Sequence, residues 1–164
     1  MSAEAQAWFA GRLPDGWGDP DVTVDREEIT VVVTLDAPPV DGGPEEVAAA
    51  EAGRIGRWRE ETREQRMQVA REAEHRFGRK VAWGAQCAGT RALFTHLAVP
   101  VMTRLRQPER LVLDTLVDAG VARSRADALA WCVKLVGRHA DAWLGELRDA
   151  LQAVERVRAD GPGL

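Results

Sequence analysis

A ten-residue segment, residues 120–129, separates two amphipathic helices and constrains the fold more than any other part of the chain. Gly120 suits the left-handed position that closes a helix, and Val121 suits the apolar contact that often follows it. Ser124 is a favoured N-cap residue, and Asp127 follows it at the spacing of a capping box. The segment therefore predicts a helix end, a tight turn and a capped helix start that can bind an anion.

Apolar residues on both sides of this turn recur at helical spacing. Upstream, Pro108 and Glu109 suit the first turn of a helix, and the apolar positions that follow fit one buried face. Downstream, apolar residues keep the same spacing over about seven turns. Gly137 weakens this stripe, so the sequence predicts one helix near residues 125–136 and another over residues 139–157.

A short segment before the first of these helices alternates between apolar and basic residues. One face of an extended chain would carry Val99, Val101, Thr103 and Leu105, and the other would carry Pro100, Met102, Arg104 and Arg106. Pro100 cannot donate a hydrogen bond to a neighbouring strand, so this segment is expected at a sheet edge. A lone short strand is unstable, and a second copy of the chain is the simplest source of a partner.

The order of strand, helix, G-x-x-x-S-R turn and helix over residues 99–136 resembles the ribbon-helix-helix family of DNA-binding proteins. The resemblance implies a homodimer whose paired strands enter the major groove of double-stranded DNA. It also implies five DNA-binding residues, with side chains facing the bases at the first three and backbone amides on phosphates at the last two: Met102, Arg104, Arg106, Ser124 and Arg125.

The first 98 residues predict a separate module. The runs V-T-V and I-T-V-V-V-T-L indicate a β-hairpin, and R-K-V-A-W-G-A-Q-C indicates a third strand. A helix over residues 45–77, closed by Gly78, lies between the hairpin and the third strand. The order ββαβ predicts a helix packed on a three-stranded sheet.

These patterns together predict an α+β fold with two domains. The first, residues 1–98, is the ββαβ module; the second, residues 99–164, is a ribbon-helix-helix unit with an extended C-terminal helix. Residues 1–20 mix glycines and prolines with aromatic residues and are expected to be irregular. Residues 90–98 are expected to form the junction between the domains.

The net charge of −4 is unevenly distributed. Residues 1–53 carry a net charge of −10, whereas residues 54–110 carry +7. A local basic field suits contact with phosphate even on an acidic protein. Three arginines of the long predicted helix, Arg59, Arg63 and Arg66, share a face and would line a phosphate path, or form a solvated face. The glutamates interleaved with them favour the solvated face.

The sequence predicts no enzyme, cofactor or metal site. It contains no G-x-x-x-x-G-K-[ST], G-x-G-x-x-G, G-x-S-x-G or H-E-x-x-H motif. Glu72 and His75 have a spacing seen in helical metal sites, but one such pair is common by chance. Cys87 and Cys132 have no metal-ligand spacing and are interpreted as reduced thiols, and Trp83 as a core or interface residue.

The composition favours a cytoplasmic location with no membrane segment. The chain has no run of about 18 apolar residues, and its N-terminus lacks the early basic cluster of a signal peptide.

The leading function predicted from these features is a sequence-specific transcriptional regulator, such as a repressor, that binds DNA as a homodimer or higher homo-oligomer. A second prediction is an antitoxin-like or scaffold protein whose C-terminal helix binds a protein partner. A third is an RNA-associated factor, or a small enzyme, that uses the N-terminal module.

Overall fold

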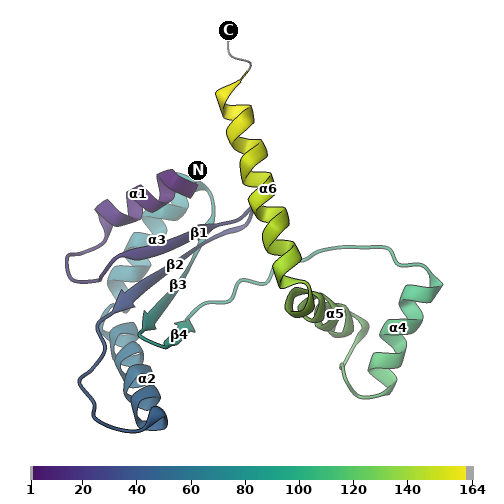
Figure 1. Ribbon diagram of the computed structural model, residues 1–164, viewed down its shortest axis with the longest axis horizontal. Helices are drawn as coiled ribbons and strands as arrows, with labels where there is room; N and C mark the ends of the chain where they lie inside the picture. The colour runs from purple at the N-terminus through teal and green to yellow at the C-terminus, as the bar shows by residue number, and fades with distance from the viewer. Residues whose placement is uncertain (1, 162–164) are drawn as a thin grey trace. The chain divides into compact units, whose positions relative to one another are not determined.

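The computed structural model of the chain describes residues 2–161, which divide into two compact units, the first ending at Pro100 and the second beginning at Val101. In the first unit the described elements are α1 (Ser2–Arg12), β1 (Pro20–Val24), β2 (Glu28–Leu35), α2 (Pro44–Glu61), α3 (Arg63–Phe77), β3 (Lys80–Cys87) and β4 (Thr90–Leu93) (Figure 1). In the second they are α4 (Gln107–Asp118), α5 (Arg125–His139) and α6 (Asp141–Asp160). The fold is α+β.

The four strands form one mixed sheet in the order β1-β2-β3-β4. β1 pairs with β2 antiparallel, and β3 pairs with β4 antiparallel, as in two hairpins. β2 and β3 are parallel, with Glu28 opposite Lys80 and Leu35 opposite Cys87. Parallel neighbours need a long crossover, which α2 and α3 supply. The predicted hairpin and third strand are confirmed. The sheet has four strands and not the predicted three, because residues 90–93, expected to be part of the junction between the domains, form β4.

One face of this sheet carries the core of the first unit. Alternate residues of β2 and β3 point to that face and are buried, as the two-residue period of a strand requires. The helices cover them with Phe9 from α1, Trp58 from α2 and Val69 from α3. The rings of Phe9 and Trp83 meet edge to face, with centroids 6.0 Å apart. Residues 1–20 are therefore not simply irregular, because α1 packs on the sheet.

The helix predicted over residues 45–77 is broken into α2 and α3 at Thr62. The Thr62 hydroxyl donates a hydrogen bond of 2.6 Å to the carbonyl oxygen of Trp58, four residues earlier. Such back-bonding by threonine often bends a helix. The apolar spacing of the sequence did not reveal this break, because both halves present their buried residues to the same sheet.

The turn between α4 and α5 has the predicted geometry. Gly120 has φ +72°, its N–H donates to the Val117 carbonyl at 3.0 Å, and the Val121 N–H donates to the Leu116 carbonyl at 2.9 Å. These are the two hydrogen bonds of a Schellman helix end. Ser124 then caps α5, since its Oγ accepts a 3.2 Å hydrogen bond from the Asp127 backbone N–H.

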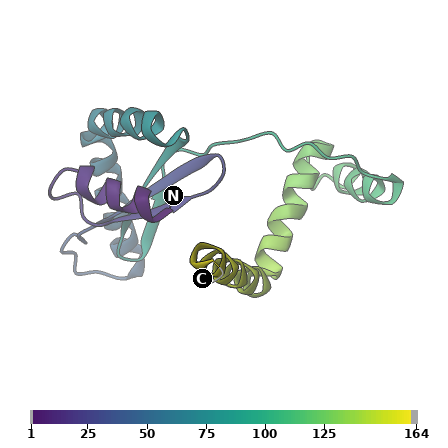
Figure 2. The same cartoon turned by 90° about the horizontal axis from the view of Figure 1, so that it is seen from above.

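The strand predicted over residues 99–106 is not formed in the described chain. This segment runs as coil between the two units (Figure 2). Its alternating pattern makes an extended conformation suitable, but no neighbouring strand satisfies its backbone groups, and Pro100 has no N–H to donate. Leu105 packs against the small core of the α4–α5 hairpin. The second unit is consequently all-helical. No helix in the described part of the chain is long and apolar enough to span a membrane.

Candidate anion-binding cavity

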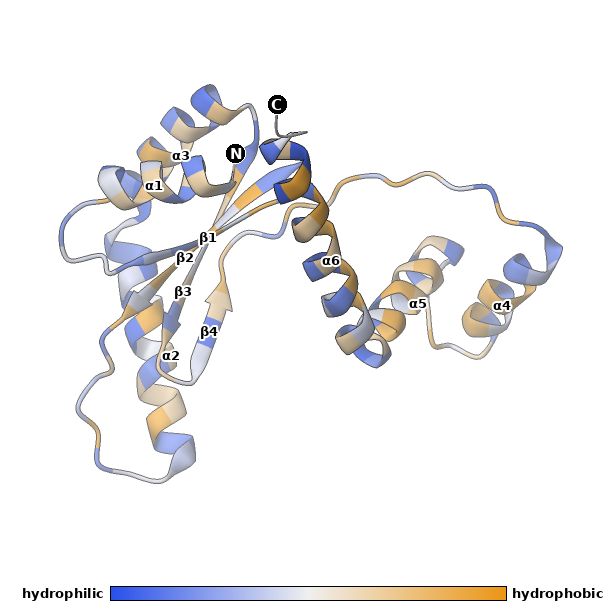
Figure 3. Ribbon diagram, turned by 45° about the horizontal axis from the view of Figure 1, so that its top comes forward, coloured by the Kyte–Doolittle hydropathy of each residue, from blue (hydrophilic) through white to orange (hydrophobic). Residues whose placement is uncertain are grey.

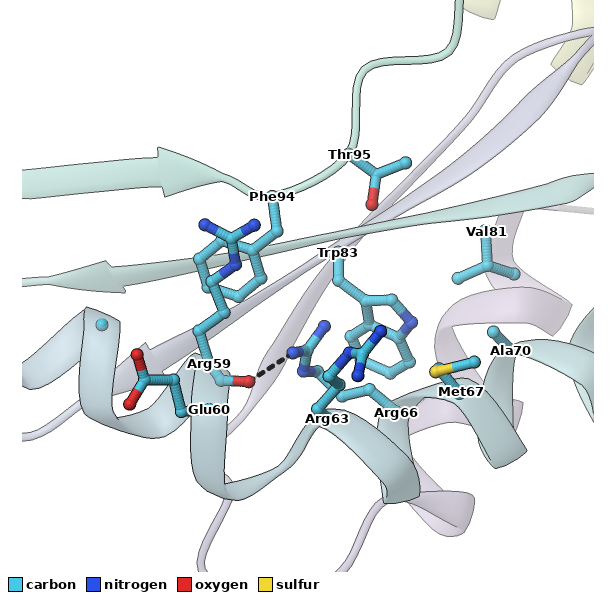
Figure 4. Close-up of a pocket in the computed structure, with 11 residues that line it drawn as sticks. Arg59, Glu60, Arg63, Arg66, Met67, Ala70, Val81, Trp83, Phe94 and Thr95 are labelled. Atoms are coloured by element: carbon cyan, nitrogen blue, oxygen red, sulfur yellow. Dashed lines mark hydrogen bonds between the residues drawn. The ribbon is translucent and has the colours of Figure 1, made fainter.

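The first unit contains a cavity of about 490 Å³ between the α2–α3 break and the ends of β3 and β4. Arginines line one part of it, and most of the rest is lined by apolar and aromatic side chains, with Glu60 and Thr95 as further polar groups (Figure 4). The break at Thr62 produces this arrangement, because it turns the chain between Arg59, at the end of α2, and Arg63 and Arg66, in α3. The three arginines that share a helix face in the sequence thus line one cavity.

Arg66 is the most unusual residue of the cavity, since it is an arginine with only 7% of its surface exposed. Its Nε donates to Thr62 Oγ1 at 3.0 Å, and its Nη2 donates to the Arg59 carbonyl oxygen at 2.6 Å. The second bond satisfies a carbonyl at the C-terminal end of α2, where a cation is also favoured by the helix dipole. Nη1 has no hydrogen-bond partner in the described part of the chain.

The charge of Arg66 is compensated by no carboxylate. Among the described residues, neither Arg66 nor Arg59 nor Arg63 forms a salt bridge. Burial, followed by the charges of Arg59 and Arg63, lowers the pKa of Arg66 to about 10. The group therefore stays protonated at neutral pH, and a buried cation of this kind favours an anionic partner.

Arg59 and Arg63 are exposed and extend the positive charge from Arg66 toward the cavity mouth. The Arg59 guanidinium lies over the ring of Phe94, 5.2 Å from its centroid, and Arg66 approaches the same ring at 5.1 Å. These contacts hold two of the cations in place without neutralising them. The arginines remain available for a ligand.

The remaining wall is apolar. It includes Ala70 from α3 and Val81 and Trp83 from β3, with Met67 exposed at the rim. Trp83 is 3% exposed and belongs to the core, as predicted, yet one side of it also lines the cavity. Its indole Nε1 is buried and has no hydrogen-bond partner among the described residues.

The sequence pointed to the three arginines of the cavity but favoured a solvated face for them. It gave no indication of Phe94 or of the cavity role of Trp83, because Trp83 lies in β3 and Phe94 directly follows β4, far along the chain from α2. Only the pairing of β4 with β3 brings Phe94 to Trp83, where its backbone N–H donates to the Trp83 carbonyl at 2.7 Å.

The side chains predicted to face DNA bases lie outside this cavity, in the second unit. Met102 is 94% exposed, and Arg104 and Arg106 are exposed as well. Arg106 is also the N-cap position of α4. The three residues lie on coil, and Met102 and Arg104 line an open pocket together with Leu129 of α5.

The two residues predicted to hold a phosphate lie at the start of α5. The Ser124 hydroxyl caps the helix. Arg125 forms a bidentate ion pair with Asp114, with Nε 2.6 Å from Oδ1 and Nη2 2.8 Å from Oδ2. The Arg125 guanidinium holds the pKa of the Asp114 carboxyl below its usual value. The Arg125 side chain is therefore committed to the α4–α5 hairpin.

No group of three His, Cys, Asp or Glu side chains within residues 2–161 is arranged to hold a metal ion. Glu72, which with His75 has the spacing of helical metal ligands, forms an ion pair with Arg12 instead. The distance from Glu72 Oε2 to Arg12 Nε is 2.6 Å. Cys87 is buried, and its Sγ donates to the Asp36 carbonyl at 3.6 Å.

Comparison with known proteins identifies the family. Residues 3–93 match the Rv1265-like protein N-terminal domain, and residues 106–158 match the Mb1296 C-terminal domain. The uncharacterized proteins Mb1296 of Mycobacterium bovis and Rv1265 of Mycobacterium tuberculosis are each 62% identical over 162 residues, covering 98% of this chain and 71% of the relative. No solved structure matches. The chain belongs to the Rv1265-like family.

This finding overturns the predicted membership of the ribbon-helix-helix family. The helical region matches the Mb1296 C-terminal domain instead, in a match that begins at residue 106, the last residue of the predicted ribbon. The structure also has three helices and no strand in the described part of this unit. The G-x-x-x-S-R turn is a well-formed connection between helices, and such turns occur in many helical hairpins.

Proposed function

We propose that this member of the Rv1265-like family is a non-catalytic binding protein whose first unit takes a phosphate-bearing ligand into the arginine cavity. One observation carries the proposal: Arg66 is buried, charged and without a carboxylate partner, and two further arginines flank it. Buried charges in proteins are paired as a rule, so a buried arginine without a carboxylate partner supports an anionic ligand.

The chemistry of the donors favours phosphate among anions. A guanidinium presents paired N–H donors that match the oxygens of a phosphate, and two or three guanidiniums can surround one group. The cavity places Arg59 and Arg63 at its mouth and Arg66 deeper inside. A phosphate held there would meet Arg66 Nη1, whose donors are unused in the described chain.

Titration calorimetry with inorganic pyrophosphate tests the proposal. Pyrophosphate should bind to the wild-type chain, and Arg63→Ala should weaken binding about tenfold, since a charge-assisted hydrogen bond contributes roughly 1.5–3 kcal/mol. Arg57→Ala is the matched control, because Arg57 is an exposed arginine of α2 outside the cavity. Equal binding by wild type and Arg63→Ala, or no binding at all, would refute the proposal.

A second candidate function is sequence-specific DNA binding, for which the coil before α4 provides support. Met102 and Arg104 are exposed there, and no side-chain hydrogen bond or salt bridge engages either of them among the described residues. The free backbone amides at the start of α5 would approach a phosphate. Arg104→Ala should weaken duplex binding by about 1–3 kcal/mol if Arg104 contacts a base. Unchanged affinity in a fluorescence anisotropy titration would remove this candidate.

We also propose that the second unit mediates assembly. α6 exposes an apolar stripe, defined by Trp143, Leu147, Leu151, Val154 and Val157. A second copy of the chain, or a protein partner in the antitoxin-like or scaffold alternative, would cover this stripe. The free thiols of Cys87 and Cys132 suit the cytoplasm as the proposed location.

A further inference from the structure

The C-terminal helix α6 is uncovered along most of its length. None of its 20 residues is buried, and the α6 stripe runs from its first turn to its last. α5 leads into the start of α6, and neither α4 nor α5 lies alongside the rest of it (Figures 1 and 2). A helix of this length spans about 30 Å, so a partner helix has about five turns to pack against.

The sequence of α6 follows the seven-residue repeat of a coiled coil. Four apolar residues recur at intervals of three, four and three, which are the spacings of the a and d positions: Leu144, Leu147, Leu151 and Val154. Leu144 is half-buried, and the other three are exposed. The next a position is Arg158. These residues form a seam that suits a second helix.

Charged residues occupy the e positions on one side of this seam. They are Arg148 and Glu155, whereas the g positions on the other side are apolar: Trp143, Ala150 and Val157. Arg148 and Glu155 are exposed, and neither forms a salt bridge in the part of the chain that the structure describes. They lie about 10 Å apart along the helix, too far to pair with each other.

The order of these two charges fits a second copy of α6 that runs antiparallel to the first. In an antiparallel pair the e positions of one helix face those of the other, so Arg148 of each copy meets Glu155 of the second copy. A two-fold axis forms this ion pair twice. The same register places Leu151 of each copy beside Val154 of the second copy, in the middle of the seam.

A parallel pair would not use these charges. Its e positions would face the apolar g positions, which leaves Arg148 and Glu155 without partners. The two Arg158 side chains would meet in one a layer, where like charges repel each other. In the antiparallel register Arg158 faces Leu147 of the second copy instead, and its aliphatic stem can cover that residue.

We infer that two copies of this chain associate through α6 as an antiparallel helix pair, in which Arg148 and Glu155 fix the direction and the register. The inference rests on the assembly proposed for the second unit and names its partner and geometry. Because each copy uses the same surface, the contact closes as a dimer and does not propagate into a filament.

Sedimentation equilibrium of the full chain with charge reversals tests the inference. Arg148→Glu sets two pairs of like charges against each other and should raise the dimer dissociation constant about tenfold. Glu155→Arg should do the same. An equal mixture of the two variants should regain the wild-type affinity, because each variant supplies the charge that the other needs. Arg156→Glu, on the outer face of α6, is the matched control and should leave the affinity unchanged.

Disulfide formation reads the direction of the pair. The antiparallel register places Ala150 beside Val157 of the second copy. In a Cys132→Ala background, a mixture of the Ala150→Cys and Val157→Cys variants should cross-link under mild oxidation, and neither variant should cross-link with itself.

Dimers that are insensitive to both charge reversals, or an Ala150→Cys variant that cross-links with itself, would overturn the antiparallel pair and leave self-association intact. A wild-type chain that stays monomeric at every concentration would overturn both. Neither result bears on the arginine cavity, because the pyrophosphate titration measures phosphate binding separately.

Discussion

The two units of the chain bury very different amounts of apolar surface. In the described residues of the first unit, sixteen buried side chains form one core that joins three helices to the sheet. Among the described residues of the second unit, only Leu113, Ala122 and Ala128 form a buried cluster. α6 adds no buried residue, and Figure 3 shows hydrophobic and hydrophilic residues interleaved along it.

This contrast predicts that the first unit folds independently, whereas the second gains stability from a partner surface. The first unit has the core that an independent domain requires. The second combines a small helical hairpin with a 20-residue helix whose apolar stripe has no cover in the described chain. Isolated helices gain most of their stability from packing, so we expect association to stabilise the second unit.

The largest effect is expected from a core truncation in the first unit. Phe9 is fully buried between α1 and the sheet, so Phe9→Ala should lower the free energy of unfolding by about 3–5 kcal/mol. Urea denaturation followed by tryptophan fluorescence measures this loss. Leu111→Ala on exposed α4 is the control and should cost far less. A loss below about 1 kcal/mol for Phe9→Ala would mean that the first unit is not held by this core.

The next effect concerns the dependence of the second unit on association. If another copy covers the α6 stripe, a hundredfold increase in protein concentration should raise the free energy of unfolding of the helical unit by about 2.7 kcal/mol, by mass action. Thermal unfolding by circular dichroism at several concentrations measures this shift. Leu151→Asp should abolish the dependence. A wild-type unfolding midpoint that does not change with concentration would show that the second unit does not depend on association.

A smaller effect is expected at the cap of α5. Ser124→Ala removes the acceptor for the Asp127 N–H and should cost about 1 kcal/mol. Ser124→Asp keeps an acceptor and should retain most of the stability. Urea unfolding monitored by helicity distinguishes the two variants, and identical midpoints would show that the cap contributes nothing to the hairpin.

The smallest effect concerns the exposed Asp114–Arg125 pair. Arg125 lowers the pKa of Asp114 in the folded state, so the contribution of the pair is present above the ordinary pKa of 3.8 and is lost as the pH falls below it. Asp114→Asn should therefore be less stable than the wild type at neutral pH, and the difference should shrink as the pH falls below 3.8. High salt should shrink the difference, because exposed pairs are screened. An acid titration of helicity in which the difference persists would contradict this assignment.

Local patterns predicted local structure well. The Gly120 and Ser124 signals gave the turn between α4 and α5, because hydrogen bonds within a few residues determine it. The alternation of I-T-V-V-V-T-L gave β2, whose neighbours β1 and β3 are both present in the chain. The segment at residues 99–106 shows the opposite case. Its alternation is compatible with a strand, but a strand also needs a neighbour, and the sequence cannot show whether one is present.

The cavity could be predicted from the sequence only in part. The spacing of Arg59, Arg63 and Arg66 is visible in the sequence, whereas the aromatic wall depends on strand pairings across the sheet. The charge of neighbouring glutamates suggested a solvated face. It did not reveal the burial of Arg66, which follows from the bend at Thr62 and the packing of α3 on β3.

The bend at Thr62 has a practical consequence for finding similar cavities in other chains. Trp58, Thr62 and Arg66 follow one another at intervals of four. In W-x-x-x-T-x-x-x-R the threonine hydroxyl donates to the tryptophan backbone carbonyl and accepts from the arginine Nε, and the guanidinium lies over the tryptophan ring, 5.4 Å from its centroid. A search that counts arginines on an unbroken helix would find only solvated surfaces. A search for this interval, in a helical stretch between two strands, would find places where a break in the helix buries an arginine side chain.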